Sequence, residues 1–281
     1  MGNGNLLILA VETSGRMGSV SLAQGPKLLA EKQFTGPMRH SAEIFPAIVG
    51  LLKHYGKKPN QIEQVHISIG PGSFTGLRIA VTLAKTMALA NPAPICLGNS
   101  AKNVFQHRHP DSQFSLFSDE TNRCGTKIVA VDTLDCIAAN VISFATENTE
   151  HTEKKNELKQ NERIAVILDA KRSQFFIAVY DRSNNGTWKK ILPDCLMTAD
   201  EFLDRFAGCG KPIALIGEGL VYYKDKFNDP AVRVLDEKFW NPSAASVHLL
   251  GWQKALLGQF ADPLTLTPNY LRGPDAKVKQ I

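Results

Sequence analysis

The chain has 281 residues, which is long for one ordinary domain and sufficient for two, or for one large α/β unit. Hydrophobic residues make up 43% and charged residues 21%, so a sizeable core can form and general disorder is excluded. The formal net charge of +5 tolerates a polyanionic partner without demanding one. Five cysteines without a C-x-x-C pair argue against a disulfide framework or a zinc finger.

The N-terminal segment predicts a strand. It reads MGNGNLLILAVETSG, with a short apolar run and no preceding basic residue, so we expect a buried strand and not a signal peptide. No stretch approaches the ~18 apolar residues of a membrane span. These features predict a soluble cytoplasmic protein that does not enter a membrane.

Apolar runs and helical periodicity then alternate along the chain. Strands are expected over residues 6–11, 18–24, 28–34, 62–69 and 94–97, with helices over 41–55 (Ser41 as N-cap) and 77–90. Further on, the pattern predicts a strand and helix within 127–145, strands over 164–169, 175–180 and 212–217, and helices over 198–206 and 243–257. This order indicates an α/β protein with mixed sheets.

Two strand–turn–strand openings, at residues 6–24 and 164–180, suggest two lobes of the same architecture. We predict a first lobe over residues 1–106, an insertion over 107–126 and a second lobe over 127–281. The second lobe would carry a charged insertion at 146–163, and its helix near 243–257 would pack back on the first lobe.

The loop GPGSFTG, residues 70–76, lies between an apolar strand and a helix. The spacing favours a purely structural tight turn, and the alternative is an anion or partner contact, in which backbone N–H groups at Gly70, Gly72 and Ser73 hold the ligand. The loop is not a Walker A motif, because the Gly-Lys-Ser/Thr ending is missing.

Four carboxylates follow predicted strands: Glu12, Asp132, Asp169 and Glu218. Acids at strand ends can bind magnesium, and they can equally be solvated. Glu12 is best placed to bind a cation or phosphate, because Thr13 and Ser14 follow it. No residue set predicts a metal site or a catalytic nucleophile, since H-x-x-x-H and G-x-S-x-G are both missing.

The predicted helix over residues 77–90 carries only two charges and has a small-residue stripe at Ala80, Ala84 and Ala88. Such a stripe allows another helix to approach closely, either within the core or from a second chain. The sequence leaves both readings open.

Three segments together resemble the TsaB (YeaZ) family: ILAVETSGRMGSVSL, RHSAEIFPAIVGLL and ISIGPGSFTGLRIAVTLAKTMALA. The similarity is nearly continuous over residues 6–97 and returns at LDAKRSQFFIAVY, at residues 217–219 and at residues 270–272. The resemblance implies an actin-like (ASKHA) fold of two ribonuclease-H-like lobes. The family usually has Asp where this chain has Glu12.

The resemblance also implies a noncatalytic scaffold or activator without a cofactor. Such a subunit pairs with the catalytic TsaD, works with the ATPase TsaE, and meets tRNA through the complex, which forms N6-threonylcarbamoyladenosine at position 37. Alone, it would form a homodimer. The chain lacks the metal motif of TsaD, and nothing supports the older glycoprotease label.

In the family, the equivalents of the helices over 41–55 and 77–90 pack against TsaD or a second copy. The expected interface residues are His40, Ile44, Ile48, Leu52, Leu77, Ala80, Ala84 and Ala88. Ala84→Arg would then abolish binding, whereas an unfolded variant would place Ala84 in the core.

Two rival functions remain open at this stage. One is an actin-like ATPase or small-molecule kinase, for which only the hairpin beginning at Glu12 is partly suitable. The other is a two-metal nuclease using Glu12, Asp132 and Asp169.

Overall fold

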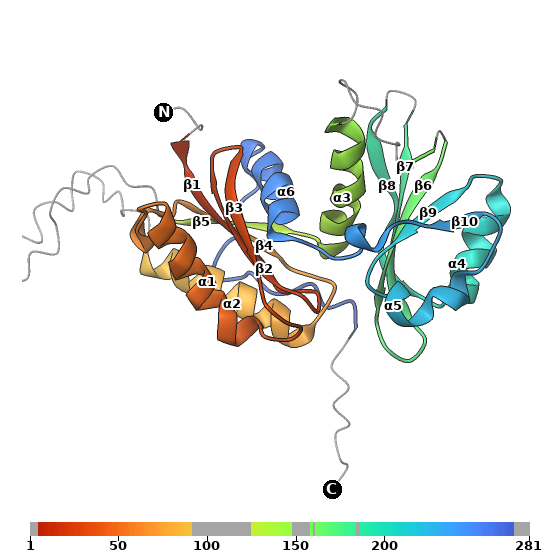
Figure 1. The fold of residues 1–281 in the computed structure, drawn as a ribbon, viewed down its shortest axis with the longest axis horizontal. Coiled ribbons are helices and arrows are strands. Elements are labelled where there is room, and N and C mark those ends of the chain that lie inside the picture. The colour runs from red at the N-terminus through yellow and green to blue at the C-terminus, as the bar shows by residue number, and fades with distance from the viewer. Residues whose placement is uncertain (1–4, 92–124, 148–157, 160, 184–185, 273–281) are drawn as a thin grey trace, which may run out of the picture.

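The structure is a computed structural model and describes residues 5–91, 125–147, 158–159, 161–183 and 186–272. Within these residues, the strands form two five-stranded sheets, in two lobes that lie side by side (Figure 1). The strand orders are β3-β2-β1-β4-β5 and β10-β9-β6-β7-β8. The predicted α/β fold with two lobes of mixed sheet is therefore confirmed.

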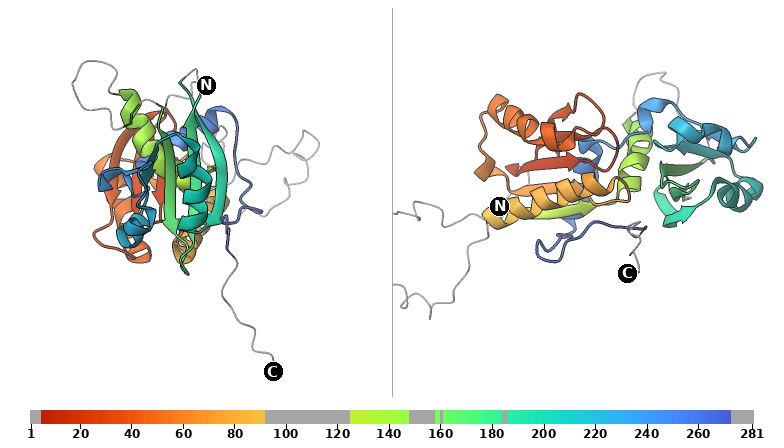
Figure 2. Two further views of the ribbon diagram at one scale, coloured as in Figure 1. Left: turned by 90° about the vertical axis from the view of Figure 1, so that its right-hand side faces the viewer. Right: turned by 90° about the horizontal axis from the view of Figure 1, so that it is seen from below.

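The first lobe is a sheet covered on both faces. Its elements are β1 (Leu7–Glu12), β2 (Ser19–Gln24), β3 (Lys27–Gln33), α1 (His40–His54), β4 (Gln64–Ser68), α2 (Phe74–Ala90) and β5 (Lys127–Val131). Strand β1 pairs antiparallel with β2 and parallel with β4, and β4 pairs parallel with β5. Helices α1 and α2 cover one face, and α6 (Ala244–Leu256) lies on the other (Figures 1 and 2).

Strand β1, with the sequence LILAVE, is buried along its whole length because it is central and covered on both sides. Leu9 and Val11 join the core beneath α1 and α2, whereas Ala10 packs with Val247 of α6. The alternation of side chains along a strand distributes them to the two faces. The near-continuous apolar run is thus explained by two covering layers.

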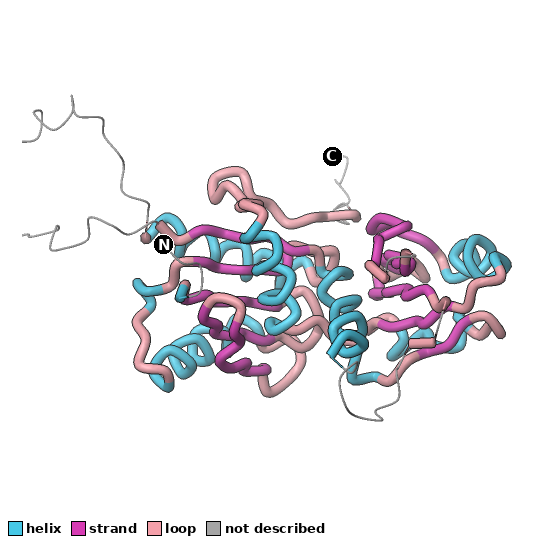
Figure 3. The backbone as a smooth tube through the Cα atoms, turned by 90° about the horizontal axis from the view of Figure 1, so that it is seen from above, coloured by secondary structure: helices cyan, strands magenta, loops and turns pink. Residues whose placement is uncertain are grey.

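The second lobe repeats this plan. It contains α3 (Thr133–Glu147), β6 (Arg163–Asp169), β7 (Phe175–Arg182), β8 (Trp188–Met197), α4 (Ala199–Phe206), β9 (Ile213–Ile216), α5 (Leu220–Tyr223) and β10 (Val232–Val234). Strand β6 pairs antiparallel with β7 and parallel with β9, as β1 does with β2 and β4. Helices α3 and α6 contact each other between the two sheets, as seen from above in Figure 3.

The structure corrects three details of the sequence prediction. The strand at Lys127–Val131 belongs to the first sheet and not to the second lobe, because it pairs with β4. Helix α1 begins at His40, and its N-cap is Arg39, which makes no side-chain cap hydrogen bond, so Ser41 is not the cap. Strands β8 and β10 were not predicted at all.

Some predictions fall on other parts of the chain. The strand over 94–97 and most of the insertions at 107–126 and 146–163 lie outside the described residues. Of the helices that are described, none combines the length and the apolar character needed to cross a membrane.

Candidate functional site

A pocket opens between the lobes, where the parallel strands of both sheets end. Ligands in open α/β sheets bind at such carboxyl ends. The pocket has a volume of about 830 Å³ and is called the cleft pocket below. It is lined by residues 14–16, Met38, residues 71–74, residues 168–171, Phe176, Glu218, Tyr222 and residues 269–272.

Glu12 lies behind this pocket and is fully buried. Its Oε1 accepts hydrogen bonds from the backbone N–H and the hydroxyl of Ser14, each at 2.5 Å. Burial raises the pKa of the Glu12 carboxyl, and the hydrogen bonds from Ser14 only partly oppose this effect. Glu12 therefore organises the end of β1 from inside the protein.

The GPGSFTG loop packs directly on the end of β1. The Thr13 hydroxyl donates to the carbonyl of Gly76 at 2.7 Å, and the backbone N–H of Ser73 donates to the carbonyl of Ser14 at 2.7 Å. A Cβ atom on Gly76 would lie 1.8 Å from the Thr13 carbonyl oxygen, so only glycine fits there. The Ser73 hydroxyl caps α2 by accepting from the Gly76 N–H.

The structure thus brings together the residues predicted as an anion or nucleotide contact, which are Glu12, Thr13, Ser14, Gly70, Gly72 and Ser73. Only Ser14, Gly72 and Ser73 line the cleft pocket. The hydroxyls of Thr13, Ser14 and Ser73 already bind neighbouring groups of the protein. The geometry accounts for these residues as structural, and an anion contact stays a prediction.

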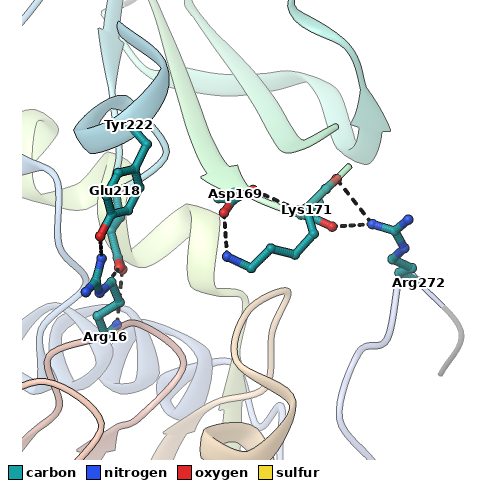
Figure 4. A network of polar contacts seen from close by, with 7 residues as sticks. Arg16, Asp169, Lys171, Glu218, Tyr222 and Arg272 are labelled. Atoms are coloured by element: carbon teal, nitrogen blue, oxygen red, sulfur yellow. Dashed lines mark hydrogen bonds and ion pairs between the residues drawn. The ribbon is translucent and has the colours of Figure 1, made fainter. Parts of the chain in front are cut away.

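Arg16 connects the two lobes (Figure 4). Its backbone N–H donates to Glu218 at 3.1 Å, its side chain lies 3.6 Å from the same carboxylate, and its guanidinium donates to the Tyr222 hydroxyl. Burial raises the pKa of the Glu218 carboxyl, and Arg16 partly opposes this rise. These contacts link the β1–β2 loop to the segment after β9.

A second connection involves the turn between β6 and β7 (Figure 4). Lys171 pairs with Asp169 at 2.7 Å, and Lys171, Arg172 and Ser173 have φ values of 66°, 55° and 57°. Residues other than glycine adopt this conformation only where the surroundings hold them. Arg272, from the C-terminal segment, donates to the carbonyls of Ala170 and Lys171 and so supports the turn.

The residues predicted as the partner interface lie in the interior of the first lobe. All eight are buried: His40, Ile44, Ile48, Leu52, Leu77, Ala80, Ala84 and Ala88. Their burial is explained by packing on the sheet, because their helical periodicity marks the face of each helix that covers it, and a partner contact through these particular side chains stays a prediction. His40, for example, contacts the Gly15 carbonyl at 3.1 Å.

The opposite sides of the same two helices are exposed. Phe45 and Val49 of α1 are 60% and 59% exposed, and Leu89 of α2 is 58% exposed. Thr82 and Thr86 of α2 are exposed as well. We call these five residues the outer face of α1 and α2.

The aromatic and cationic lining of the cleft pocket was missed by sequence reasoning. Phe74, Tyr222, Tyr270 and Arg272 come from segments far apart in the chain, so no local pattern could group them. The similarity to a known family at residues 270–272 was the one available signal for the C-terminal part.

The fold and site define a class: a two-lobed α/β protein of the actin-like type, with a pocket between two lobes of ribonuclease-H-like topology. Comparisons with known proteins support similarity of the chain to the TsaB/YeaZ family. Its residues 36–112 match the family model of TsaD, described as tRNA N6-adenosine threonylcarbamoyltransferase.

Individual relatives cover almost the whole chain. The tRNA threonylcarbamoyladenosine biosynthesis protein TsaB of Bacillus subtilis is 26% identical over 98% of each chain, and that of Escherichia coli K12 is 21% identical over 94% of each. The solved structure of YeaZ from Pseudomonas aeruginosa has a TM-score of 0.63 at 20% identity, covering 95% of this chain and 100% of that one. A second solved structure, described as similar to peptidase YEAZ from Pseudomonas aeruginosa, has a TM-score of 0.66 at 19% identity, over 95% and 100% of the two chains.

Proposed function

We propose that this protein is a noncatalytic scaffold or activator in the formation of N6-threonylcarbamoyladenosine in tRNA, and that it pairs with a TsaD-type catalytic subunit through the outer face of α1 and α2. In this proposal it acts in the cytoplasm, with a TsaE-type ATPase as a further partner and a homodimer as its form when alone. The names of its relatives support the pathway, and the outer face supports the mode of action.

The single observation that carries the pairing is the apolar exposure of α1. Phe45 and Val49 stand one turn apart, so their side chains are neighbours on the solvent side of α1. Exposed apolar side chains that cluster in this way mark protein–protein contacts. The adjacent threonines of α2 are small enough to let a partner helix approach closely.

The noncatalytic role is supported by the state of the acids at the strand ends. Oε1 of Glu12 binds Ser14, Asp169 is paired with Lys171, and Glu218 is held by Arg16. A general base needs an accessible carboxylate close to its substrate. Each of these three carboxylates instead stabilises a neighbouring loop.

The pairing is tested by measuring the affinity of the full chain for the TsaD-type protein of the same organism by calorimetry. Val49→Glu places a charge in the outer face, and we expect it to weaken binding by at least about tenfold, while the melting temperature stays within about 2 °C. Leu257→Glu is the matched control, because Leu257 is 75% exposed at the end of α6. Equal affinity of Val49→Glu and wild type would refute the proposed surface.

A further inference from the structure

Aromatic rings from both lobes line the cleft pocket and remain accessible. Phe74 and Tyr270 belong to the first-lobe side and are 42% and 39% exposed, with their ring centroids 5.0 Å apart. Tyr222, on α5 of the second lobe, is 61% exposed. Rings packed into a core would not keep this accessibility, so the pocket offers flat apolar surfaces on both sides.

Two guanidinium groups near the pocket have no carboxylate partner among the described residues: Arg272 lines the pocket, and Arg78 contacts two of its lining residues, Phe74 and Tyr270. Arg78 lies over the Phe74 ring, with its Cζ 3.9 Å from the centroid, and donates to the Tyr270 hydroxyl. Arg272 donates to backbone carbonyls. Among the described residues neither forms an ion pair, and a carbonyl does not neutralise a positive charge.

The acids of the pocket do not cancel this charge. Asp169 lies 2.7 Å from Lys171, and Glu218 lies 3.6 Å from Arg16, so each carboxylate already has its own cation. Arg78 and Arg272 are therefore the positive charges left for a ligand. A ligand that matches the pocket combines a flat aromatic group with negative charge.

We propose that the cleft pocket binds single-stranded RNA, with one unpaired base stacked against its aromatic walls and adjacent phosphates held by Arg78 and Arg272. Aromatic platforms flanked by arginines are the usual means of binding single strands, because every base has a face that stacks. A volume of about 830 Å³ lies within the roughly 300–1,000 Å³ of sites that enclose a small ligand, so an unstacked nucleotide fits.

This inference rests on the proposed function, which brings a tRNA to the complex, and it assigns part of that contact to this subunit. An RNA loop is favoured over an acidic peptide, because acidic side chains would satisfy the arginines but leave the exposed rings of Tyr222 and Phe74 uncovered. It is favoured over a free nucleotide because Arg78 and Arg272 lie on different segments, which suits successive phosphates of one strand.

The test is the fluorescence anisotropy of a labelled anticodon stem–loop RNA titrated with the full chain. Tyr222→Ala removes a stacking surface, and we expect about tenfold weaker binding, equivalent to ~1.4 kcal/mol of stacking. Tyr222→Phe is the matched control, since it loses the bond to Arg16 but keeps the ring, and its affinity should stay within twofold of wild type. Arg272→Gln should reduce the slope of log K against log salt by about 0.7.

Four results would overturn the proposal: no RNA binding by the wild type, unchanged binding by Tyr222→Ala, equal loss in Tyr222→Phe, or displacement of the RNA by a free mononucleotide at equal concentration. The Val49→Glu variant separates this test from that of the proposed function. It should lose the protein partner and keep RNA affinity as an isolated chain. Failure of the wild-type chain to bind the TsaD-type partner, with its RNA binding intact, would refute the proposed function alone.

Discussion

At the scale of single residues, Glu12 shows how a buried acid affects stability. Its pKa in the folded chain is raised above the ordinary 4.5 by burial. The stability that Glu12 contributes in its protonated form is therefore fully present below pH 4.5. It is lost as the pH rises through the pKa that Glu12 has in the folded chain. In the Glu12→Gln variant, this loss cannot occur.

We expect the free energy of unfolding of Glu12→Gln, relative to wild type, to increase with pH above 4.5 by up to about 1.4 kcal/mol per pH unit, until the folded pKa is reached. Urea unfolding at several pH values measures this difference. A difference independent of pH would show that Glu12 titrates normally in the folded chain.

A second residue-scale prediction concerns two glycines. Gly76→Ala would place a Cβ 1.8 Å from the Thr13 carbonyl oxygen, so we expect a loss of about 3 kcal/mol or more. Gly50→Ala in α1 meets no atom within 4 Å and should instead add about 0.5–1 kcal/mol of stability. Thermal unfolding of both variants checks the pair. Similar stabilities would contradict the close packing of the loop on β1.

The sequence identified the residues at the end of β1 and in the GPGSFTG loop as belonging together, because strand ends and glycine-rich turns are local patterns. It did not identify which helix faces are exposed. Ala84 was expected at an interface and is buried at 0% exposure, since a small-residue stripe fits a sheet as well as a partner helix. The proposed contact surface instead rests on the exposed Phe45 and Val49.

At the scale of elements, a histidine pair joins α6 to the first sheet. His66 of β4 stacks on His248 of α6 with ring centroids 5.7 Å apart. Burial, together with the charge of His248, lowers the pKa of His66 to about 3. The unfolded chain therefore binds more protons than the folded one below pH 6.5, and stability falls as the pH drops from about 6.5 towards 3.

We expect His66→Gln to reduce this acid sensitivity by up to about 1.4 kcal/mol per pH unit between pH 6.5 and 4.5. Urea unfolding of wild type and His66→Gln at three pH values measures this difference in acid sensitivity. The carboxylates are the same in both proteins, so their effect on stability cancels in the comparison. If the two proteins lose stability equally, the pair does not control the acid response.

An element is predicted accurately from the sequence where residues close together in the chain determine it. The strands and helices described over residues 5–91 were placed within a few residues, because apolar runs end at glycine or polar turns. Strand β8 was missed because a lysine, Lys190, is half-buried and an isoleucine, Ile191, is exposed, which reverses the expected alternation, and Pro193 interrupts it. The sheet to which Lys127–Val131 belongs depends on pairing with β4, a contact between distant segments.

At the scale of the whole molecule, few polar contacts cross the mouth of the cleft pocket. The pair of Arg16 and Glu218 is partly exposed, and exposed pairs contribute only about 0–1 kcal/mol. We expect Arg16→Ala to shift the melting temperature by less than about 4 °C, yet to broaden the distance distribution between spin labels on the two lobes. An unchanged distribution would mean that α3 and α6 alone fix the lobes.

The central claim is that the chain serves a partner and does not perform the chemistry. The most direct measurement is the formation of N6-threonylcarbamoyladenosine in tRNA by purified components, with this chain, the TsaD-type protein and the TsaE-type ATPase supplied together or singly omitted. We predict no product from this chain alone, full activity from the complete set, and loss of activity with Val49→Glu but not Leu257→Glu. Product from this chain alone, or undiminished activity when it is omitted, would contradict the account.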